Sequence, residues 1–134
     1  MKNHPAATRV LRLAAADMQA ARQPLASLIG KSEKAQRRLA PASWQFKMLQ
    51  DHLQALRLAG ALLDGRTDAA TGFASDDLRA ALRALASMAA KTEPALAKFA
   101  PGTAQHSLSR NRLHALRTAA ALVEAELAKK KDRL

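Results

Sequence analysis

KSEKAQRRLAPASWQ at 31–45 matches KTEPALAKFAPGTAQ at 91–105, and LQALRLAGALL at 53–63 matches LHALRTAAALV at 113–123. Both matches lie at an offset of 60 residues. Helix-forming Ala, Leu, Lys, Arg and Glu dominate these stretches, and each copy contains one Ala-Pro step, where a helix tends to end. A repeated pair of helices therefore decides the fold.

The repeat extends well beyond these stretches. Aligning 17–63 with 77–123 without a gap gives 19 identities in 47 positions, where chance in so Ala-rich a chain would give about 6. The unit is therefore about 60 residues long. We predict one domain over 1–134, with repeats at 11–65 and 71–127, a linker at 66–75 and a basic C-terminal tail at 128–134.

Composition agrees with packed helices. The 134 residues include 5 Gly, 5 Pro and no Cys, and only 3% are aromatic. Few turn formers and few aromatics argue against a sandwich or a barrel, and the lack of Cys excludes disulfides and thiolate metal sites. Because no apolar run approaches the ~20 residues of a membrane span, we expect a cytoplasmic protein without a transmembrane segment.

The first copy reads as two helices. Apolar and small residues recur every three or four positions from Leu11 to Leu39, as in a helix that packs along its length. Pro24 and Gly30 within this stretch predict a kink or a break between 23 and 31. Ser43 is the predicted N-cap of the second helix.

The second copy follows the same plan. Asp76 or Ser75 is the predicted cap of its first helix, and Pro94 predicts a kink or a restart. Thr103 is the predicted cap of the last helix. At the end of the first copy, Asp64 and Gly65 mark the helix end.

One hairpin has a single apolar seam and cannot bury it alone. Two hairpins can face each other, so we predict an all-α, four-helix, up-down-up-down bundle built from a tandem duplication, with its first and third helices kinked or broken. The many Ala residues make the core thin, which favours further burial through a homodimer.

The net charge of +11 favours polyanionic partners. Basic residues at helical spacing form stripes beside the predicted seams. A nucleic-acid-binding role is expected for Lys31, Lys34, Arg37, Arg38, Arg110, Arg112, Arg117, Lys129, Lys130 and Lys131. The alternative is that the aliphatic parts of these side chains cover the apolar faces of the helices, while their charged groups stay in water.

Three further side chains have open roles. Trp44 and Phe46 lie among cations, where an aromatic ring could stack on a nucleobase, but we favour a plug that closes the end of the bundle. His106 takes the place of Phe46 in the second copy and is expected to be a partly buried residue at the bundle end rather than a ligand or a general base.

The motifs of common catalytic and metal sites are missing from the sequence. It has no Glu-x-x-His pair, no Gly-x-Ser-x-Gly elbow and no Gly-rich phosphate loop. We therefore expect a non-catalytic protein without metal or cofactor, which binds DNA, RNA or another polyanion without strong sequence specificity.

Two rival hypotheses remain open. The first is a protein–protein adaptor or regulatory bundle, for which Leu13, Leu58, Leu62 and Leu122, off the main stripes, would form an exposed patch. The second is association with the surface of an anionic membrane.

Overall fold

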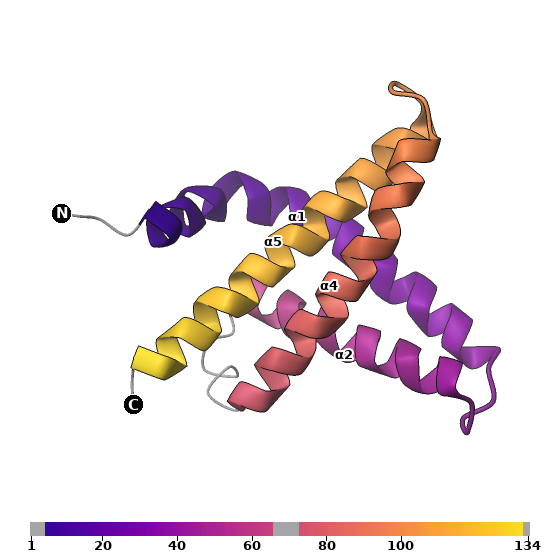
Figure 1. Cartoon of the computed structure of the whole chain (residues 1–134), viewed down its shortest axis with the longest axis horizontal. Coiled ribbons are helices and arrows are strands. Elements are labelled where there is room, and N and C mark those ends of the chain that lie inside the picture. Colours follow the sequence, from indigo (N-terminus) through magenta and orange to yellow (C-terminus); the bar gives the residue numbers. More distant parts are fainter. Residues whose placement is uncertain (1–4, 66–72, 133–134) are drawn as a thin grey trace.

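The computed structural model describes residues 5–65 and 73–132. Within these ranges the chain forms four α-helices and no strand. The helices are α1 (Pro5–Arg37), α2 (Trp44–Leu63), α4 (Ser75–Lys98) and α5 (Ala104–Asp132), as Figure 1 shows. The prediction of an all-helical protein with four helices is confirmed.

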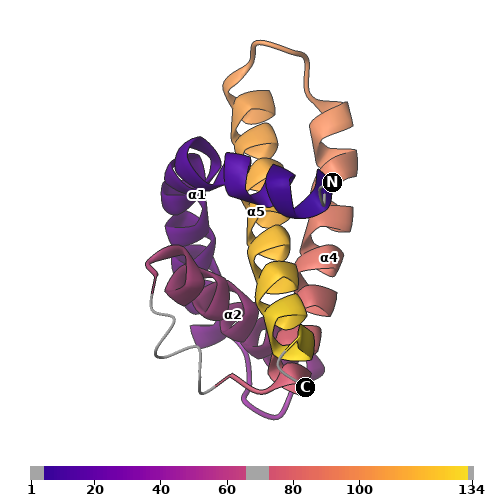
Figure 2. The same cartoon turned by 90° about the vertical axis from the view of Figure 1, so that its left-hand side faces the viewer.

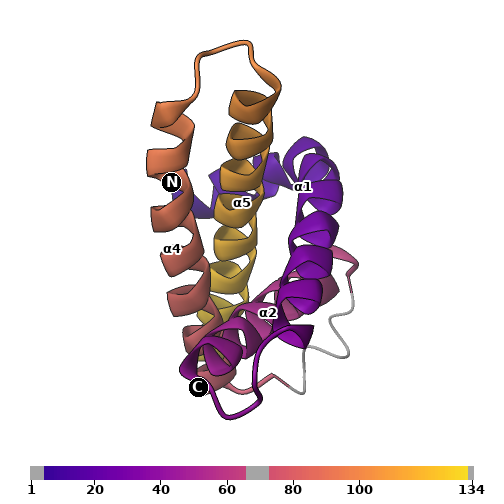
Figure 3. The same ribbon diagram turned by 90° about the vertical axis from the view of Figure 1, so that its right-hand side faces the viewer.

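The helices form two pairs that cross each other. α4 and α5 lie side by side and are joined by 99–103, and α1 is joined to α2 by 38–43 (Figures 2 and 3). In Figure 1 the α4–α5 pair runs across the α1–α2 pair. α2 and α5 each contact all three other helices, whereas α1 and α4 share no contact within the ranges described. α2 and α5 are therefore the central helices.

The hydrophobic core lies where these helices meet. Its largest fully buried side chains are Leu56, Leu78, Leu85, Leu116 and Val123. α1 contributes Ala21 and Leu25. Full burial of a Leu or Val side chain stabilises the fold by about 1.5–3 kcal/mol. Several other core residues are Ala, whose small side chains allow the helices to pack closely.

The buried positions of α2 recur in α5. Between 51 and 60 two residues of every three are buried, and nearly the same rhythm returns between 111 and 120. The buried pairs at this offset are Leu53 and Leu113, Ala55 and Ala115, Leu56 and Leu116, Leu58 and Thr118, Ala59 and Ala119, and Leu63 and Val123. The two central helices therefore bury equivalent positions of the two sequence copies.

Two ion pairs also recur at this offset. Arg57 Nη2 lies 2.6 Å from Glu33 Oε2, and Arg117 Nη2 lies 2.8 Å from Glu93 Oε2. The first pair joins α2 to α1, and the second joins α5 to α4. These side chains are largely solvent-exposed, so each pair adds less than about 1 kcal/mol. Each pair joins equivalent positions of its own hairpin.

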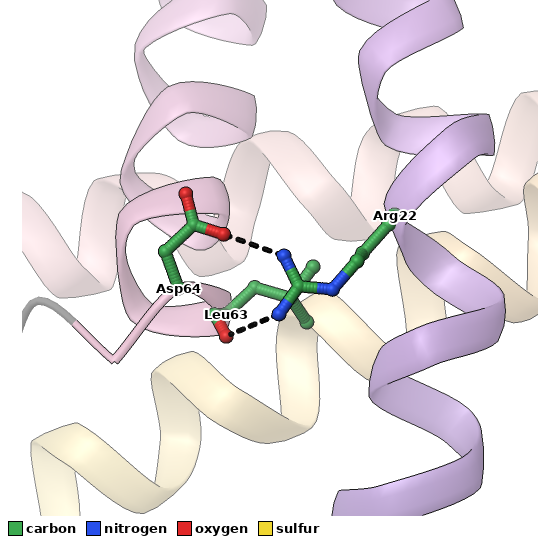
Figure 4. Close-up of polar contacts among 3 residues, drawn as sticks. All are labelled: Arg22, Leu63 and Asp64. Carbon is green, nitrogen blue, oxygen red and sulfur yellow. Dashed lines mark hydrogen bonds and ion pairs between the residues drawn. The ribbon is translucent and has the colours of Figure 1, made fainter.

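Contacts unique to one copy hold α1 in place. Arg22 of α1 donates to Asp64 Oδ1 at 2.6 Å and to the carbonyl oxygen of Leu63 at 3.4 Å, at the end of α2 (Figure 4). Asp17, which precedes Arg22 in α1, contacts α5 instead: its Oδ1 lies 2.7 Å from His114 Nε2. α1 is thus tied to both central helices.

Several predicted helix ends are confirmed. Ser43 Oγ accepts the N–H of Phe46 at 3.2 Å, and Thr103 Oγ1 accepts the N–H of His106 at the same distance. Asp64 is the C-cap of α2, and the following Gly65 has φ 74°, a conformation that glycine adopts without strain.

The structure excludes a break at Pro24 and a restart at Pro94, which leaves the kink as the other predicted alternative, and it corrects the predicted cap of α4. Pro24 lies inside an unbroken α1, and Pro94 lies inside an unbroken α4. Each proline removes one backbone hydrogen bond, and the remaining bonds and packing carry the helix through; α1 nevertheless changes direction along its length (Figure 2). The N-cap of α4 is Ala74, not Ser75 or Asp76, and Asp77 Oδ2 accepts its N–H at 3.2 Å.

The predicted linker and tail are only partly covered by the structure. Of the linker, 66–72 lie outside the described residues, and Ser75 already belongs to α4. Helix α5 continues through most of the predicted tail, as far as Asp132. The basic run at the end of the chain is therefore an extension of a central helix.

A candidate nucleic-acid interface

The two hairpin turns lie at opposite ends of the molecule in Figures 2 and 3, the α4–α5 turn at the top and the α1–α2 turn at the bottom. In Figure 1 both are on the right, whereas the start of α1 and the end of α5 are on the left. We call 34–50 tip 1 and 94–110 tip 2. Among the side chains that the structure describes, the three most exposed large hydrophobic ones lie in these tips: Trp44, Phe99 and Leu108 are 68%, 37% and 47% exposed.

Tip 1 combines an exposed aromatic ring with uncompensated positive charge. It contains four cations and no acidic residue: Lys34, Arg37, Arg38 and Lys47. All four side chains are exposed, and none of them forms an ion pair with any residue that the structure describes. Their charge is therefore available to an anionic partner.

Hydrogen bonds fix the backbone that carries these side chains. Ser43 caps α2 through the N–H of Phe46 and also donates its hydroxyl to the carbonyl of Ala40 at 2.8 Å. Gln36 of α1 donates to Gln50 Oε1 of α2 at 2.9 Å and to the carbonyl of Phe46 at 3.4 Å. The two helix ends are thus held together, and the cations project from an ordered support.

The plug hypothesis for Trp44 is wrong. Trp44 is the first residue of α2 and is 68% exposed, so it does not close the bundle end. Phe46, two positions later, is half-buried. Residues two apart on a helix point in different directions, which explains why only one of the two aromatic rings faces inward.

Tip 2 carries less charge and a different apolar surface. It contains two exposed cations, Lys98 and Arg110, and again no acidic residue. His106 is half-buried, as expected, and lines a hollow of about 430 Å³ together with Phe99, Glu93 and Arg117. At the position equivalent to Trp44, tip 2 has Ala104.

The structure does not gather all the predicted binding residues on one surface. Lys31, Lys34, Arg37 and Arg38 lie on or just after the last turns of α1 and are exposed, and Arg110 is exposed near the start of α5. Arg117 is paired with Glu93. Arg112 is half-buried, and its Nε has no hydrogen-bond partner among the described atoms.

The basic run at the end of α5 lies away from both tips. Lys129 Nζ is 3.7 Å from Glu126 Oε1, Lys130 is half-buried, and the side chain of Lys131 lies outside the described part. In Figure 1 this end of α5 is on the left, opposite the turns. The predicted stripes thus fall into at least two separate basic regions.

A groove between α2 and α4 was not predicted from the sequence. It has a volume of about 830 Å³, and its polar lining includes Asp51, His52, Arg57, Asp77 and Arg83. These residues come from α2 and α4, which follow each other in the described part of the chain but belong to different helix pairs. The spacing of residues within either helix does not predict the groove, because the groove depends on how the two helix pairs cross.

His52 is the perturbed titratable group of this groove. Burial lowers its pKa below the ordinary value of 6.5, and the nearby positive charge of Lys91 lowers the pKa further, against a smaller opposing effect of Asp51. Lys91 reaches over the groove end, where its Nζ lies 3.7 Å from the sulfur of Met48. The neutral imidazole is therefore the form that the fold favours.

This burial predicts that stability depends on pH. The unfolded chain binds a proton at His52 more readily than the folded chain, so the free energy of unfolding should fall as the pH drops through 6.5. The loss should level off below the folded pKa. Urea unfolding at about pH 7.5 and about pH 5 should show a smaller loss in His52→Gln than in the unsubstituted protein. Equal losses in the two proteins would contradict this account.

Comparisons with known proteins supply no family. The chain matches no protein-family model, and neither curated proteins nor solved structures yield a match. Among the described residues, no group of three or more His, Asp or Glu side chains is placed to hold a metal ion. No helix in the part of the chain described is both long and apolar enough to cross a membrane.

Proposed function

We propose that this protein binds nucleic acid without catalysis and without strong sequence specificity, and that tip 1 is the principal contact. The observation that carries the proposal is the group of four exposed cations at 34–50 with no acidic residue and no ion pair among the described residues. Elsewhere, Arg22, Arg57 and Arg117 are each neutralised by a carboxylate.

Charge of this kind is suited to the phosphate backbone. Arg and Lys contacts to phosphates release condensed counterions, which gives affinity without reading the bases. The tip offers no groove-filling helix surface with base-reading side chains, because its cations are spread over a helix end, a turn and a helix start. Sequence specificity is therefore expected to be weak.

A salt series tests this proposal. Fluorescence anisotropy with a labelled mixed-sequence DNA or RNA should give affinity at about 50 mM salt and a log–log slope near −3, as expected for about four phosphate contacts. Affinity should fall by about a thousandfold over a tenfold rise in salt. Absence of binding at about 50 mM salt, or binding insensitive to salt, would refute the proposal.

The adaptor hypothesis named four leucines off the main stripes as an exposed patch, and three of them are not exposed. Leu58 and Leu62 are only 8% and 7% exposed, and Leu122 is half-buried. The side chain of Leu13 lies outside the described part. Leu58, Leu62 and Leu122 therefore offer little surface for docking a partner helix, and the exposed large apolar side chains described are instead those of the two tips.

For the origin of the fold, we infer a tandem duplication of an antiparallel helical hairpin. The support is the recurrence, 60 residues apart, of the Glu–Arg ion pair, the hydroxyl N-cap and the buried positions of the central helices. The pattern of helix contacts also agrees, because α1 packs on α5 as α4 packs on α2. Independent evolution of the two halves would not favour the same contacts at one offset.

A further inference from the structure

The exposure of Trp44 calls for an explanation beyond charge. A Trp side chain is usually largely buried, and burying it contributes substantially to stability. Here the ring is 68% exposed, although the half-buried Phe46 is only two residues away. A large, flat ring left in water on a basic surface is the usual feature of a base-stacking platform.

The cations around Trp44 are placed for a strand that runs past the ring. Lys47 lies one helical turn further along α2, on the same face as Trp44. Arg37 ends α1, and Arg38 follows it in the turn that leads to α2. Phosphates on either side of a stacked base would therefore meet positive charge from both helices.

Stacking on Trp44 distinguishes single strands from duplexes. In a duplex the faces of the bases are covered by their neighbours, whereas an unpaired base can lie flat on an aromatic ring. Tip 2 has Ala104 at the position equivalent to Trp44, and its own aromatic ring, Phe99, is less exposed than Trp44, at 37% against 68%. The ordered turn around Ser43 holds the platform in place and limits the entropy lost on binding.

We propose that tip 1 binds single-stranded nucleic acid, with one base stacked on Trp44 and the adjacent phosphates on Arg37, Arg38 and Lys47. This inference rests on the proposed function, since it specifies the kind of nucleic acid that the basic tip takes. It predicts a preference for single strands that depends on one aromatic side chain.

The intrinsic fluorescence of Trp44 can report binding at tip 1. Trp44 is the only Trp, and there is no Tyr, so emission excited in the Trp band comes from this ring alone. Titration of the full chain with oligo(dT) of about 12 nucleotides should quench this emission, because a strand of that length spans a typical binding site. A mixed-sequence duplex of the same length should bind with little quenching.

Substitution then separates stacking from charge. Trp44→Ala should weaken binding of the single strand by about 5- to 100-fold and leave duplex affinity within about twofold. Trp44→Phe should restore much of the affinity. The matched control is Phe99→Ala, which removes the exposed aromatic ring of tip 2 and should leave single-strand binding nearly unchanged. Circular dichroism checks that the variants keep their helices.

The outcomes distinguish this inference from the proposed function. Salt-dependent binding with equal affinity for single strand and duplex, or with no effect of Trp44→Ala, would overturn stacking and leave the basic tip as a phosphate-binding surface. No binding to either nucleic acid at about 50 mM salt would overturn both. A blue shift of Trp44 emission with anionic phosphatidylglycerol vesicles, without quenching by oligo(dT), would replace nucleic acid with a lipid surface.

Discussion

Replacing Leu56 with Ala should lower the free energy of unfolding by about 3 kcal/mol. Leu56 is fully buried in α2, the central helix that contacts α1, α4 and α5. The change removes apolar burial and leaves a cavity that three surrounding helices cannot close without moving. A domain of this size is stable by only about 5–15 kcal/mol, so the variant should lose a large share of its stability.

Leu116 offers the matching test in the second copy. It is 1% exposed at the equivalent position of α5, and Leu116→Ala should cost a similar amount. Leu108→Ala is the control, because Leu108 is 47% exposed and should cost less than about 0.5 kcal/mol. Urea unfolding followed by circular dichroism measures all three. A cost for Leu56→Ala no larger than that for Leu108→Ala would contradict the described core.

Removing three cations from tip 1 should reduce nucleic-acid affinity by about 100-fold at about 0.1 M salt. The variant is Lys34→Gln/Arg37→Gln/Arg38→Gln, in which none of the replaced side chains forms an ion pair with a described residue. Each lost phosphate contact should also reduce the magnitude of the log–log salt slope by about 0.7 to 0.9. Stability should change little, because the three side chains are exposed.

The control removes the same charge from the other basic region. Lys129→Gln/Lys130→Gln/Lys131→Gln lowers the net charge equally, but the substituted residues lie at the end of α5. Affinity should fall by less than about fivefold if the location of the charge decides binding. Equal losses in the two triple variants would show that only the overall charge of the protein matters, and tip 1 would lose its special role.

Much of the local structure was predictable from the sequence. Ser43 and Thr103 cap their helices as the residue types indicated, and Asp64 with Gly65 ends α2. These features depend on neighbours within a few residues, where side-chain chemistry decides the backbone. Of the alternatives predicted at the prolines, the break at Pro24 and the restart at Pro94 did not occur, because the remaining hydrogen bonds and packing against other helices outweigh the loss of one hydrogen bond.

The width of the buried faces was less predictable. A single stripe at spacings of three and four assumes one packing partner, and it left Leu58 and Leu62 outside the core. The structure buries both, because α2 contacts three helices and therefore needs a wider apolar face. The way the two helix pairs cross decides how many partners each helix has. The spacing of apolar residues within one helix does not predict this crossing.

The candidate site was also predictable in part only. The basic character of Lys34, Arg37 and Arg38 was evident from the sequence, but the absence of ion pairs between them and the described residues was not. Arg57 and Arg117 looked equally basic, and each meets a Glu 24 positions earlier in the chain. The exposure of Trp44 likewise depends on which way the first turn of α2 faces, and an aromatic residue at a helix start is compatible with either burial or exposure.

The most direct test of the central claim is a map of the binding surface by NMR. Backbone amide shifts of the full chain should be recorded before and after addition of a short single-stranded oligonucleotide. The account predicts the largest changes at 34–50, with the indole N–H of Trp44 among them, smaller changes at 94–110, and almost none at 124–132. Changes centred on the end of α5 or on the groove between α2 and α4, with tip 1 unaffected, would contradict it.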